Sequence, residues 1–293
     1  MTELIHTAID RGATLYSSVS GGKDGQAMTA TLIANGFPLA GLIHADLGRI
    51  EWQQSLPMCQ MLSDKFNVPL FVVRRSDGLD MVDYWKRRMM MLQGQNKPFW
   101  SSSSARYCTS DLKRGPINKF LTSTGHDFII SCEGIRAEES TARAQKEVLT
   151  IRSNSSTYYY GMTAAEAITN FKAGKKLFLT WFPVFNFSLA DVLATFDNTI
   201  DQLNQFRAEY KATNALNSLW NFHPAYVLGN DRVSCKFCVL GSNNDLAVGA
   251  ANDENNVLDE LIEMEEFSGY TFKNGWSLRN LKNPPAEQQL TLF

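Results

Sequence analysis

The sequence lacks several features that would place the chain in a membrane or in a secreted class. Its 293 residues contain no apolar run of about 18 residues, the length that a membrane-spanning helix requires. The first 13 residues are polar and amphipathic, without the apolar segment of a signal peptide. The five cysteines of a chain without a leader favour packing, metal binding or catalysis over disulfides. We therefore expect a cytoplasmic protein with no membrane contact.

A strong overall charge is also missing. The formal net charge of −2 and the pI of about 6.1 argue against a nucleic-acid-binding surface that covers the whole protein. The charge is nevertheless uneven, because residues 74–119 hold ten Lys and Arg against four Asp. Residues 240–272 hold eight acidic residues and no basic one, which a solvated helix face explains. The basic stretch overlaps a motif described below and indicates phosphate binding.

Apolar stretches alternate with helical patterns along the first two thirds of the chain. Strands are expected at 39–46, 70–73, 127–132 and 177–184, and helices at 52–66 and 79–93. This alternation predicts an α/β fold with a parallel twisted sheet, helices on both faces and a smaller helical C-terminal portion. We expect a core at 1–200, a helical portion at 201–282 and a flexible tail at 283–293. Residues 150–176 read as a polar insertion without an assigned role.

The most informative stretch runs from Leu15 to Gly25, where an apolar strand meets a glycine turn and a helix that continues to about Asn35. Two adjacent glycines allow a sharp turn and a close approach to a ligand. Main-chain N–H groups of the turn and of the helix start then form an anion cradle, with Ser20 as the helix cap and Lys23 as a mobile charge. An ordinary strand–turn–helix junction with a capping Ser is the alternative.

The string Ser20-Gly21-Gly22-Lys23-Asp24 resembles the PP-loop, S-G-G-x-D-S, of the adenine nucleotide alpha-hydrolase superfamily. Members cleave ATP between the α- and β-phosphates or bind an adenylyl-sulfate. Gly25 stands where the superfamily usually has Ser. The resemblance implies an ATP site with Asp24 also reaching Mg²⁺, and phosphate contacts from Ser18, Ser20, Gly21, Gly22, Lys23, Asp24 and Gly25.

Three further segments resemble elements of the phosphoadenosine phosphosulfate (PAPS) reductase-like family within this superfamily. The segment from Asp46 to Glu51 is similar to D-T-G-x-E, so Asp46 is expected to hold adenosine and Gly48 to let the base pass closely. The segment from Arg106 to Pro116 is similar to R-x-C-x-x-x-L-K-x-x-P, and the third, which starts at Gly134, to G-x-R-x-x-E-S-x-x-R. The resemblance implies that side chains of these segments contact phosphate or sulfate and stabilise the charge on the leaving pyrophosphate. The expected catalytic residues are Lys23, Asp24, Lys113, Arg136 and Arg143.

A Cys-x-x-Cys pair, Cys235 and Cys238, brings two sulfurs to one point, as a metal or cluster requires. The preceding P-x-Y-x-x-G-x-x-R resembles the branch of the family that includes the DNA phosphorothioation subunit, whose members hold an iron–sulfur cluster. That resemblance implies a cluster on Cys108, Cys235 and Cys238, with Cys132 as a possible fourth ligand. Zinc with His223 is the alternative.

The sequence ends in Gln289-Leu290-Thr291-Leu292-Phe293, which is similar to the Q-L-[SD]-L-F peptide that grips the DNA polymerase sliding clamp. Coincidence and docking on the body of the protein are the alternatives. No cysteine follows Cys238, so the E-C-G-x-H signature of true PAPS reductases is missing.

These resemblances together predict an ATP-dependent enzyme that adenylylates a substrate and leaves AMP, so that sulfur can be inserted. DNA or a nucleotide is the expected substrate, and a cysteine desulfurase is the expected sulfur donor. Two rivals stay open. One is a sulfonucleotide reductase or sulfotransferase that uses PAPS, and the other is a non-catalytic clamp-docking protein with a relic nucleotide fold.

Overall fold

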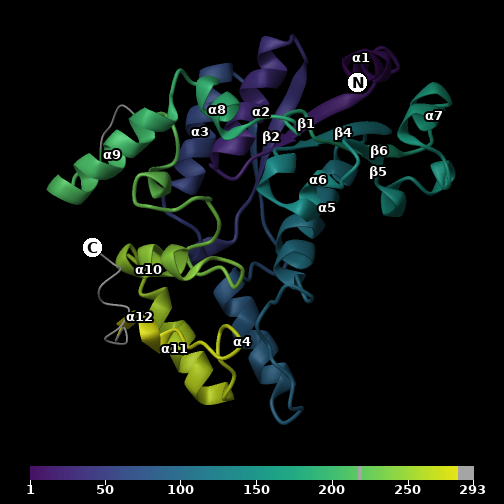
Figure 1. The fold of residues 1–293 in the computed structure, drawn as a ribbon. Coiled ribbons are helices and arrows are strands. Elements are labelled where there is room, and N and C mark those ends of the chain that lie inside the picture. The colour runs from purple at the N-terminus through teal and green to yellow at the C-terminus, as the bar shows by residue number, and fades with distance from the viewer. Residues whose placement is uncertain (217–219, 283–293) are drawn as a thin grey trace.

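The computed structural model describes residues 1–216 and 220–282 (Figure 1). Its centre is a six-stranded sheet in the order β3-β2-β1-β4-β6-β5. Every neighbouring pair is parallel except β5 and β6, which are antiparallel. The predicted α/β fold class is therefore confirmed. The strands are β1 Thr14–Ser18, β2 Leu39–Ala45, β3 Leu70–Val73, β4 Phe128–Glu133, β5 Leu149–Ile151 and β6 Leu177–Trp181.

Helices cover both faces of this sheet, as Figure 1 shows. Alternate strand residues point into different cores: Leu15 packs with Met28 and Leu32 of one helix, whereas Tyr16 packs with Leu121 of another. This alternation is the period of two that a strand buried on both faces requires. The helices are α1 Thr2–Asp10, α2 Lys23–Ala34, α3 Ser55–Phe66, α4 Met81–Leu92, α5 Gly115–Ser123, α6 Thr141–Ala144, α7 Ala164–Thr169, α8 Leu189–Ala194, α9 Ile200–Thr213, α10 Asn243–Ala251, α11 Val257–Ser268 and α12 Arg279–Lys282.

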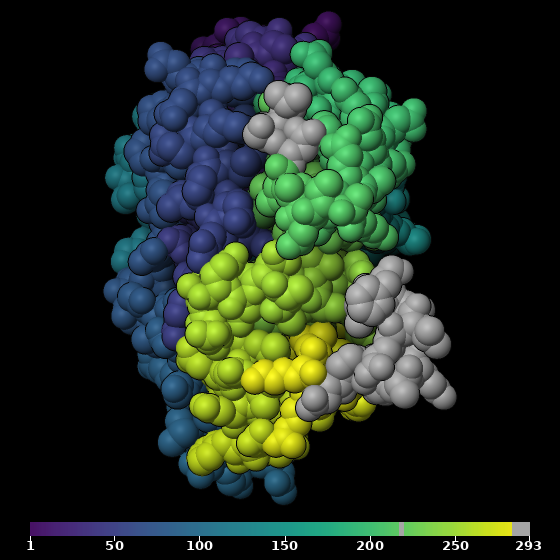
Figure 2. Space-filling model, turned by 90° about the vertical axis from the view of Figure 1, so that its left-hand side faces the viewer, coloured from purple at the N-terminus to yellow at the C-terminus, as the bar shows by residue number. Residues whose placement is uncertain are grey.

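A second group of helices lies below the sheet and contains α4 together with α10, α11 and α12 (Figure 1). Val82 and Trp85 of α4 share a hydrophobic core with Leu258 and Leu261 of α11. The helical C-terminal portion thus completes its core with a helix from the first third of the chain. Figure 2 shows its yellow-green surface directly against the blue and purple N-terminal half. The division of the chain at residue 200 stays a prediction.

Arg49 fixes this second group to the sheet. It lies in a short helix, Gly48–Ile50, that follows β2. Its guanidinium contacts Asp80 at 2.7 Å, Asp83 at 2.6 Å and Glu260 at 2.7 Å. These carboxylates stand at the starts of α4 and α11, so one cation orients two helices relative to the ends of the strands.

The stretch 150–176, expected to be a polar insertion, contributes an edge strand and a helix to the sheet domain. β5 pairs with β6 through Thr150 opposite Thr180, and Ile168 of α7 is buried in the same core as Leu177. The strand has three residues and alternates polar with apolar side chains, which is too short a pattern to stand out in a polar sequence. Within the described residues no helix is long and apolar enough to cross a membrane.

A close main-chain contact between α10 and the cysteine pair gives a stability test. A Cβ at Gly249 would lie 2.4 Å from the Lys236 carbonyl oxygen, whereas a Cβ at Gly25 in α2 would make ordinary contacts from 3.6 Å. We expect Gly249→Ala to lower the free energy of unfolding by about 1–3 kcal/mol through overpacking. The matched change Gly25→Ala should leave it unchanged or raise it by up to about 1 kcal/mol. Urea denaturation measures both, and equal stability of the two variants would contradict this packing.

Candidate active site

The glycine turn connects the end of β1 at Ser18 to the start of α2 at Lys23. Gly21 has a φ of +75°, and a Cβ there would lie 2.8 Å from the Ser55 carbonyl oxygen, so this position requires glycine. Gly22 occupies the N-cap position of α2, and no side chain caps the helix. The expectation that Ser20 is the cap is therefore wrong, because the turn contains two residues between Ser20 and the first helical residue.

Free main-chain N–H groups remain at the start of α2. A helix leaves its first N–H groups without partners inside the helix. The N–H of Lys23 donates to the Tyr226 hydroxyl at 3.0 Å, and that of Gln26 donates to the Gly22 carbonyl at 3.2 Å. The N–H groups of Asp24 and Gly25 donate to no other described residue. Together with the helix dipole, they can receive an anion.

A buried ion triad lies directly under this turn. Asp24 accepts from Arg136 through one carboxylate oxygen at 2.5 Å, and its other oxygen lies 3.3 Å from the Lys23 ammonium. Lys23 and Arg136 are buried, with 5% and 3% of their surfaces exposed, so Lys23 is not the mobile charge that the sequence predicted. Burial lowers the pKa of Lys23 although Asp24 acts in the opposite direction. The triad holds two cations against the glycine turn.

Arg143 brings further positive charge to the same place. Burial lowers the pKa of its guanidinium, and the neighbouring Arg232, Arg136 and Arg106 lower it further. Glu139 is the carboxylate that pairs with Arg143. An arginine whose pKa is lowered by burial and by neighbouring cations favours a polyanion nearby, because a bound anion relieves the repulsion between the cations. The sequence motifs predict Arg136 and Arg143 as site residues. Arg106 and Arg232 stand in the same motifs but were not predicted.

Gly134 lies at the end of β4, where it meets the start of α2. A Cβ there would lie 2.7 Å from the main-chain oxygen of Asp24 and 2.8 Å from the nitrogen of Gly25. The missing side chain therefore lets β4 approach the glycine turn and place Arg136 two residues later. The sequence predicted Gly134 as a ligand contact, and the structure shows close main-chain packing at this position.

A hollow of about 470 Å³ opens at the ends of β2 and β3 beside Asp46 and Gly48. Asp46 accepts from the Gly48 N–H at 2.7 Å and pairs with Arg74 at 2.5 Å. Gly48 has a φ of +75°, and a Cβ there would lie 2.4 Å from Cβ of Asp80. Asp46 thus faces space of a size suited to a nucleoside, while Gly48 serves the packing of α4 against this loop.

His44 lies in the wall of that hollow and is almost completely buried. Its Nδ1 lies 3.2 Å from the Val19 carbonyl oxygen, and its Nε2 lies 3.3 Å from a Glu51 carboxylate oxygen, within ion-pair range though not aligned as a hydrogen bond. Burial alone would lower the pKa of His44, but Cys59, whose sulfur lies 3.7 Å from Nδ1, and the neighbouring Glu51 carboxylate raise it to about 10. This environment favours the charged form of the imidazole in the wall of the hollow.

Three of the four predicted cluster cysteines gather around Lys113. Burial lowers the pKa of Lys113, and the neighbouring Cys235, Glu51, Cys238 and Cys108 act in the opposite direction, so that the pKa is raised. Burial raises the pKa of the Cys235 thiol, although Lys113 lowers it. Cys132 does not join them, because its buried thiol packs with Leu15 and Trp181 in the core of the sheet. Among residues 1–216 and 220–282, no three His, Cys, Asp or Glu side chains are arranged to hold a metal ion.

His223, the alternative zinc ligand, is engaged elsewhere. Its Nδ1 accepts from the Ala225 N–H at 3.1 Å, and its Nε2 lies 3.3 Å from the Ser55 hydroxyl. Burial lowers the pKa of His223 to about 4. The imidazole therefore stays neutral and braces the segment before the cysteine pair against α3.

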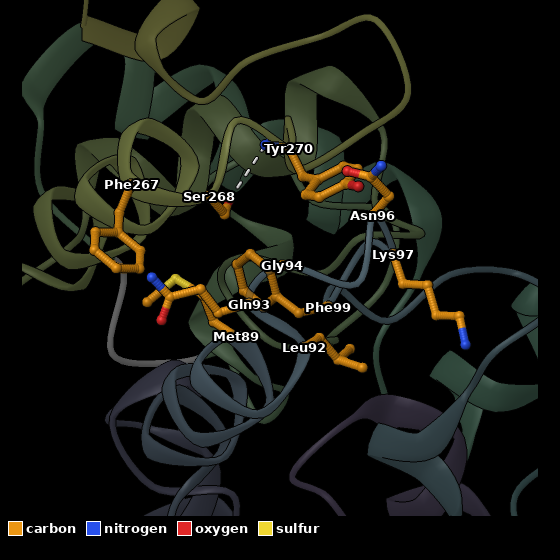
Figure 3. A pocket seen from close by; sticks show the side chains of 10 residues that line it. All are labelled: Met89, Leu92, Gln93, Gly94, Asn96, Lys97, Phe99, Phe267, Ser268 and Tyr270. Carbon is orange, nitrogen blue, oxygen red and sulfur yellow. Dashed lines mark hydrogen bonds between the residues drawn. The ribbon is translucent and has the colours of Figure 1, made fainter.

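A second, smaller hollow of about 240 Å³ lies between the C-terminal ends of α4 and α11. Figure 3 shows Met89 and Leu92 on one side of it and Phe267 and Tyr270 on the other. None of the residues that the sequence assigned to binding or catalysis lines it. This smaller hollow is therefore not part of the candidate active site.

Comparison with known families agrees with this geometry. The model of the phosphoadenosine phosphosulfate reductase domain matches residues 14–213, which is more than half of the chain and includes the glycine turn, Lys113, Arg136 and Arg143. The chain belongs to this family. Membership makes it a nucleotide-using enzyme of the PP-loop type and leaves the specific reaction open. No curated protein matches the sequence.

Solved structures with a similar fold are distant from this member of the PAPS reductase family. The PAPS reductase of Candida auris in a phosphate complex is 14% identical with a TM-score of 0.46, covering 80% of this chain and 87% of that one. The FMN adenylyltransferase of Candida glabrata with FAD and inorganic pyrophosphate is 13% identical with a TM-score of 0.36, covering 63% and 48%. Likenesses this distant do not indicate a substrate.

The two buried histidines titrate in opposite directions, which gives a direct test of the site. We expect His44 to stay charged at pH 8 and His223 to stay neutral at pH 5. Since the pKa of His44 is raised, its contribution to stability is complete below about pH 6.5 and is lost as the pH rises towards 10. NMR titration of the imidazoles measures both groups.

Glu51→Gln removes the main carboxylate beside His44 and should lower the pKa of that residue towards 6.5, with His223 unchanged. A wild-type His44 that titrates near its ordinary value would contradict the buried ion pair.

Proposed function

We propose that this protein is an ATP-dependent PP-loop enzyme that cleaves ATP between the α- and β-phosphates and activates a nucleic-acid or nucleotide substrate for sulfur transfer. The observation that carries the proposal is the position of the cation cluster. Arg136 contacts Asp24 at this turn, and Arg143 lies near Asp24 and Arg136, with Arg106 and Arg232 as further cations beside Arg143. The Asp24 and Gly25 N–H groups have no partner among the described residues. A triphosphate is the ligand whose charge matches both features.

The chemistry follows from the charge. An oxygen of the substrate forms a bond to the α-phosphorus, the bond from that phosphorus to the bridging oxygen of the β-phosphate breaks, and pyrophosphate leaves. Lys23, Arg136 and Arg143 stabilise the charge that develops on the leaving group. The outer sulfur of a cysteine persulfide then attacks the activated atom of the substrate, the bond from that atom to the AMP oxygen breaks, and AMP leaves. A second cysteine thiolate attacks the inner persulfide sulfur, which frees the sulfur on the product and leaves a disulfide that an external thiol reduces. Asp46, beside the larger hollow, is our candidate for holding the adenosine.

Asp24 does not fit a protein-held Mg²⁺ in the present arrangement. Both of its carboxylate oxygens are engaged, one by Arg136 and the other by Lys23. Mg²⁺ in nucleotide enzymes is often held chiefly by the phosphates themselves. We therefore propose that Mg²⁺ arrives with ATP, and that Asp24 positions the two cations.

Cys108, Cys235 and Cys238 are our candidates for carrying the sulfur. Their common position beside Lys113 supports a shared role. Burial raises the pKa of the Cys235 thiol, so its reaction as a nucleophile requires loss of the proton when substrate binds. The described residues do not fit an iron–sulfur cluster in this arrangement. We propose instead that one of these cysteines carries the sulfur as a persulfide, which a cysteine desulfurase supplies.

A PAPS-using activity is the second candidate, because the matching family model is that of the PAPS reductase domain. Preference for adenosine 3′,5′-bisphosphate over ATP in calorimetry would support this candidate and count against ATP cleavage.

A radiolabel experiment tests the proposed reaction. With α-labelled ATP and total DNA or total tRNA as acceptor, we expect the wild type to release AMP and pyrophosphate. Arg143→Gln should lower the rate by about tenfold or more, because a charged hydrogen bond to phosphate contributes about 1.5–3 kcal/mol. Arg87→Gln is the matched control, since Arg87 is a surface arginine paired with Asp77. Formation of ADP, or equal loss in both variants, would contradict the assignment.

DNA is the substrate that the tail favours, through the resemblance of Gln289–Phe293 to clamp-binding peptides. This segment lies outside the described residues. We expect deletion of residues 289–293 to abolish co-elution with the purified sliding clamp without changing ATP binding. A five-residue deletion of 284–288, which leaves the peptide intact, serves as the control. Clamp binding that survives the tail deletion would overturn this part of the proposal.

A further inference from the structure

Tyr226 reaches the glycine turn from the C-terminal part of the chain. It lies in the short helix Pro224–Tyr226, with 2% of its surface exposed. Its hydroxyl accepts the Lys23 N–H at 3.0 Å and would lie 3.4 Å from a Cβ on Gly22. The Lys23 ammonium lies 4.8 Å from the centre of the Tyr226 ring. The phenol therefore faces the same first turn of α2 that offers its N–H groups to a phosphate.

The main chain around Tyr226 is held firmly from behind. Arg207 of α9 donates to the Tyr226 carbonyl at 2.8 Å and to the Asn230 carbonyl at 3.2 Å. The Asn230 N–H donates to the Ala225 carbonyl at 2.9 Å, which closes the turn. The phenol is thus placed by a rigid frame, as a group that recognises a ligand must be.

The phenol proton has no partner in this frame. A tyrosine hydroxyl can donate one hydrogen bond as well as accept, and buried donors are nearly always paired. Here the oxygen accepts from Lys23, and the hydroxyl donates to no acceptor within residues 1–216 and 220–282. Burial, with the nearby Asp24 charge, raises the pKa of Tyr226, so the proton stays on the oxygen. An acceptor is therefore missing beside the Asp24 and Gly25 N–H groups.

We propose that the Tyr226 hydroxyl is a phosphate-binding group of this site, donating its proton to a phosphate oxygen of the nucleotide while its own oxygen holds the Lys23 N–H. The proposal rests on the nucleotide site proposed above and adds a ligand that none of the motifs of the first half of the chain contains. It also makes the segment that leads to Cys235 and Cys238 part of the nucleotide site, so nucleotide binding fixes the position of the thiols.

Tyr226→Phe tests this role, and the chain contains a close control. Tyr159 is also fully buried, and its hydroxyl accepts the Lys172 N–H at 3.0 Å, but it lies in the core of the sheet domain. We expect calorimetry on the full chain to show ATP binding weakened by about tenfold or more in Tyr226→Phe and by less than about twofold in Tyr159→Phe. Adenosine binding should be equal in all three proteins, because the lost contact is to phosphate.

Other outcomes overturn the proposal in distinguishable ways. ATP binding that is unchanged or tighter in Tyr226→Phe would show that the hydroxyl only fills the turn or competes with phosphate. Equal weakening of ATP and adenosine would indicate a general loss of the fold, which the melting temperatures of both variants report independently. A wild type that binds no adenine nucleotide would remove the proposed function itself, and the Tyr226 role with it.

Discussion

The buried contact between Asp24 and the two cations Lys23 and Arg136 is the interaction on which the site depends. Burying a charge is costly unless it is paired, and removing one partner of such a group leaves the others uncompensated. The carboxylate satisfies this requirement from the first turn of α2, while Arg136 comes from beyond the end of β4. The pairing therefore joins the segments that follow β1 and β4 beside the glycine turn.

The rest of the molecule arranges further groups around that point. Arg49 ties the loop after β2 to α4 and α11, and through them positions the lobe that carries the cysteine pair. Tyr226, which precedes the cysteine pair in the chain, packs with residues of α3 and α8 and accepts from the Lys23 N–H of the glycine turn. The proposed nucleotide site and the segment that leads to the thiols are therefore in contact through this residue.

Local patterns in the sequence predict most of the fold and, within the candidate site, the glycine turn. The strand, glycine turn and helix at 14–34 are readable because the turn needs glycine and the flanking residues are apolar. Contacts between residues far apart in the sequence cannot be predicted from local patterns. Tyr226 stands more than two hundred residues after Lys23, and the residues around it do not indicate that it contacts the glycine turn. Cys132 is a position where the local pattern misleads. Its place at the end of a strand suggests a ligand of a metal cluster, but its side chain packs in the core of the sheet domain.

A crystal structure with a non-hydrolysable ATP analogue would show directly whether the glycine turn binds the phosphates. We expect the phosphates against the Asp24 and Gly25 N–H groups, within hydrogen-bond distance of Arg143 and the Tyr226 hydroxyl, with the adenosine in the hollow beside Asp46. Phosphates bound elsewhere, or a glycine turn that stays closed on Tyr226 while the analogue binds at another place, would contradict this expectation.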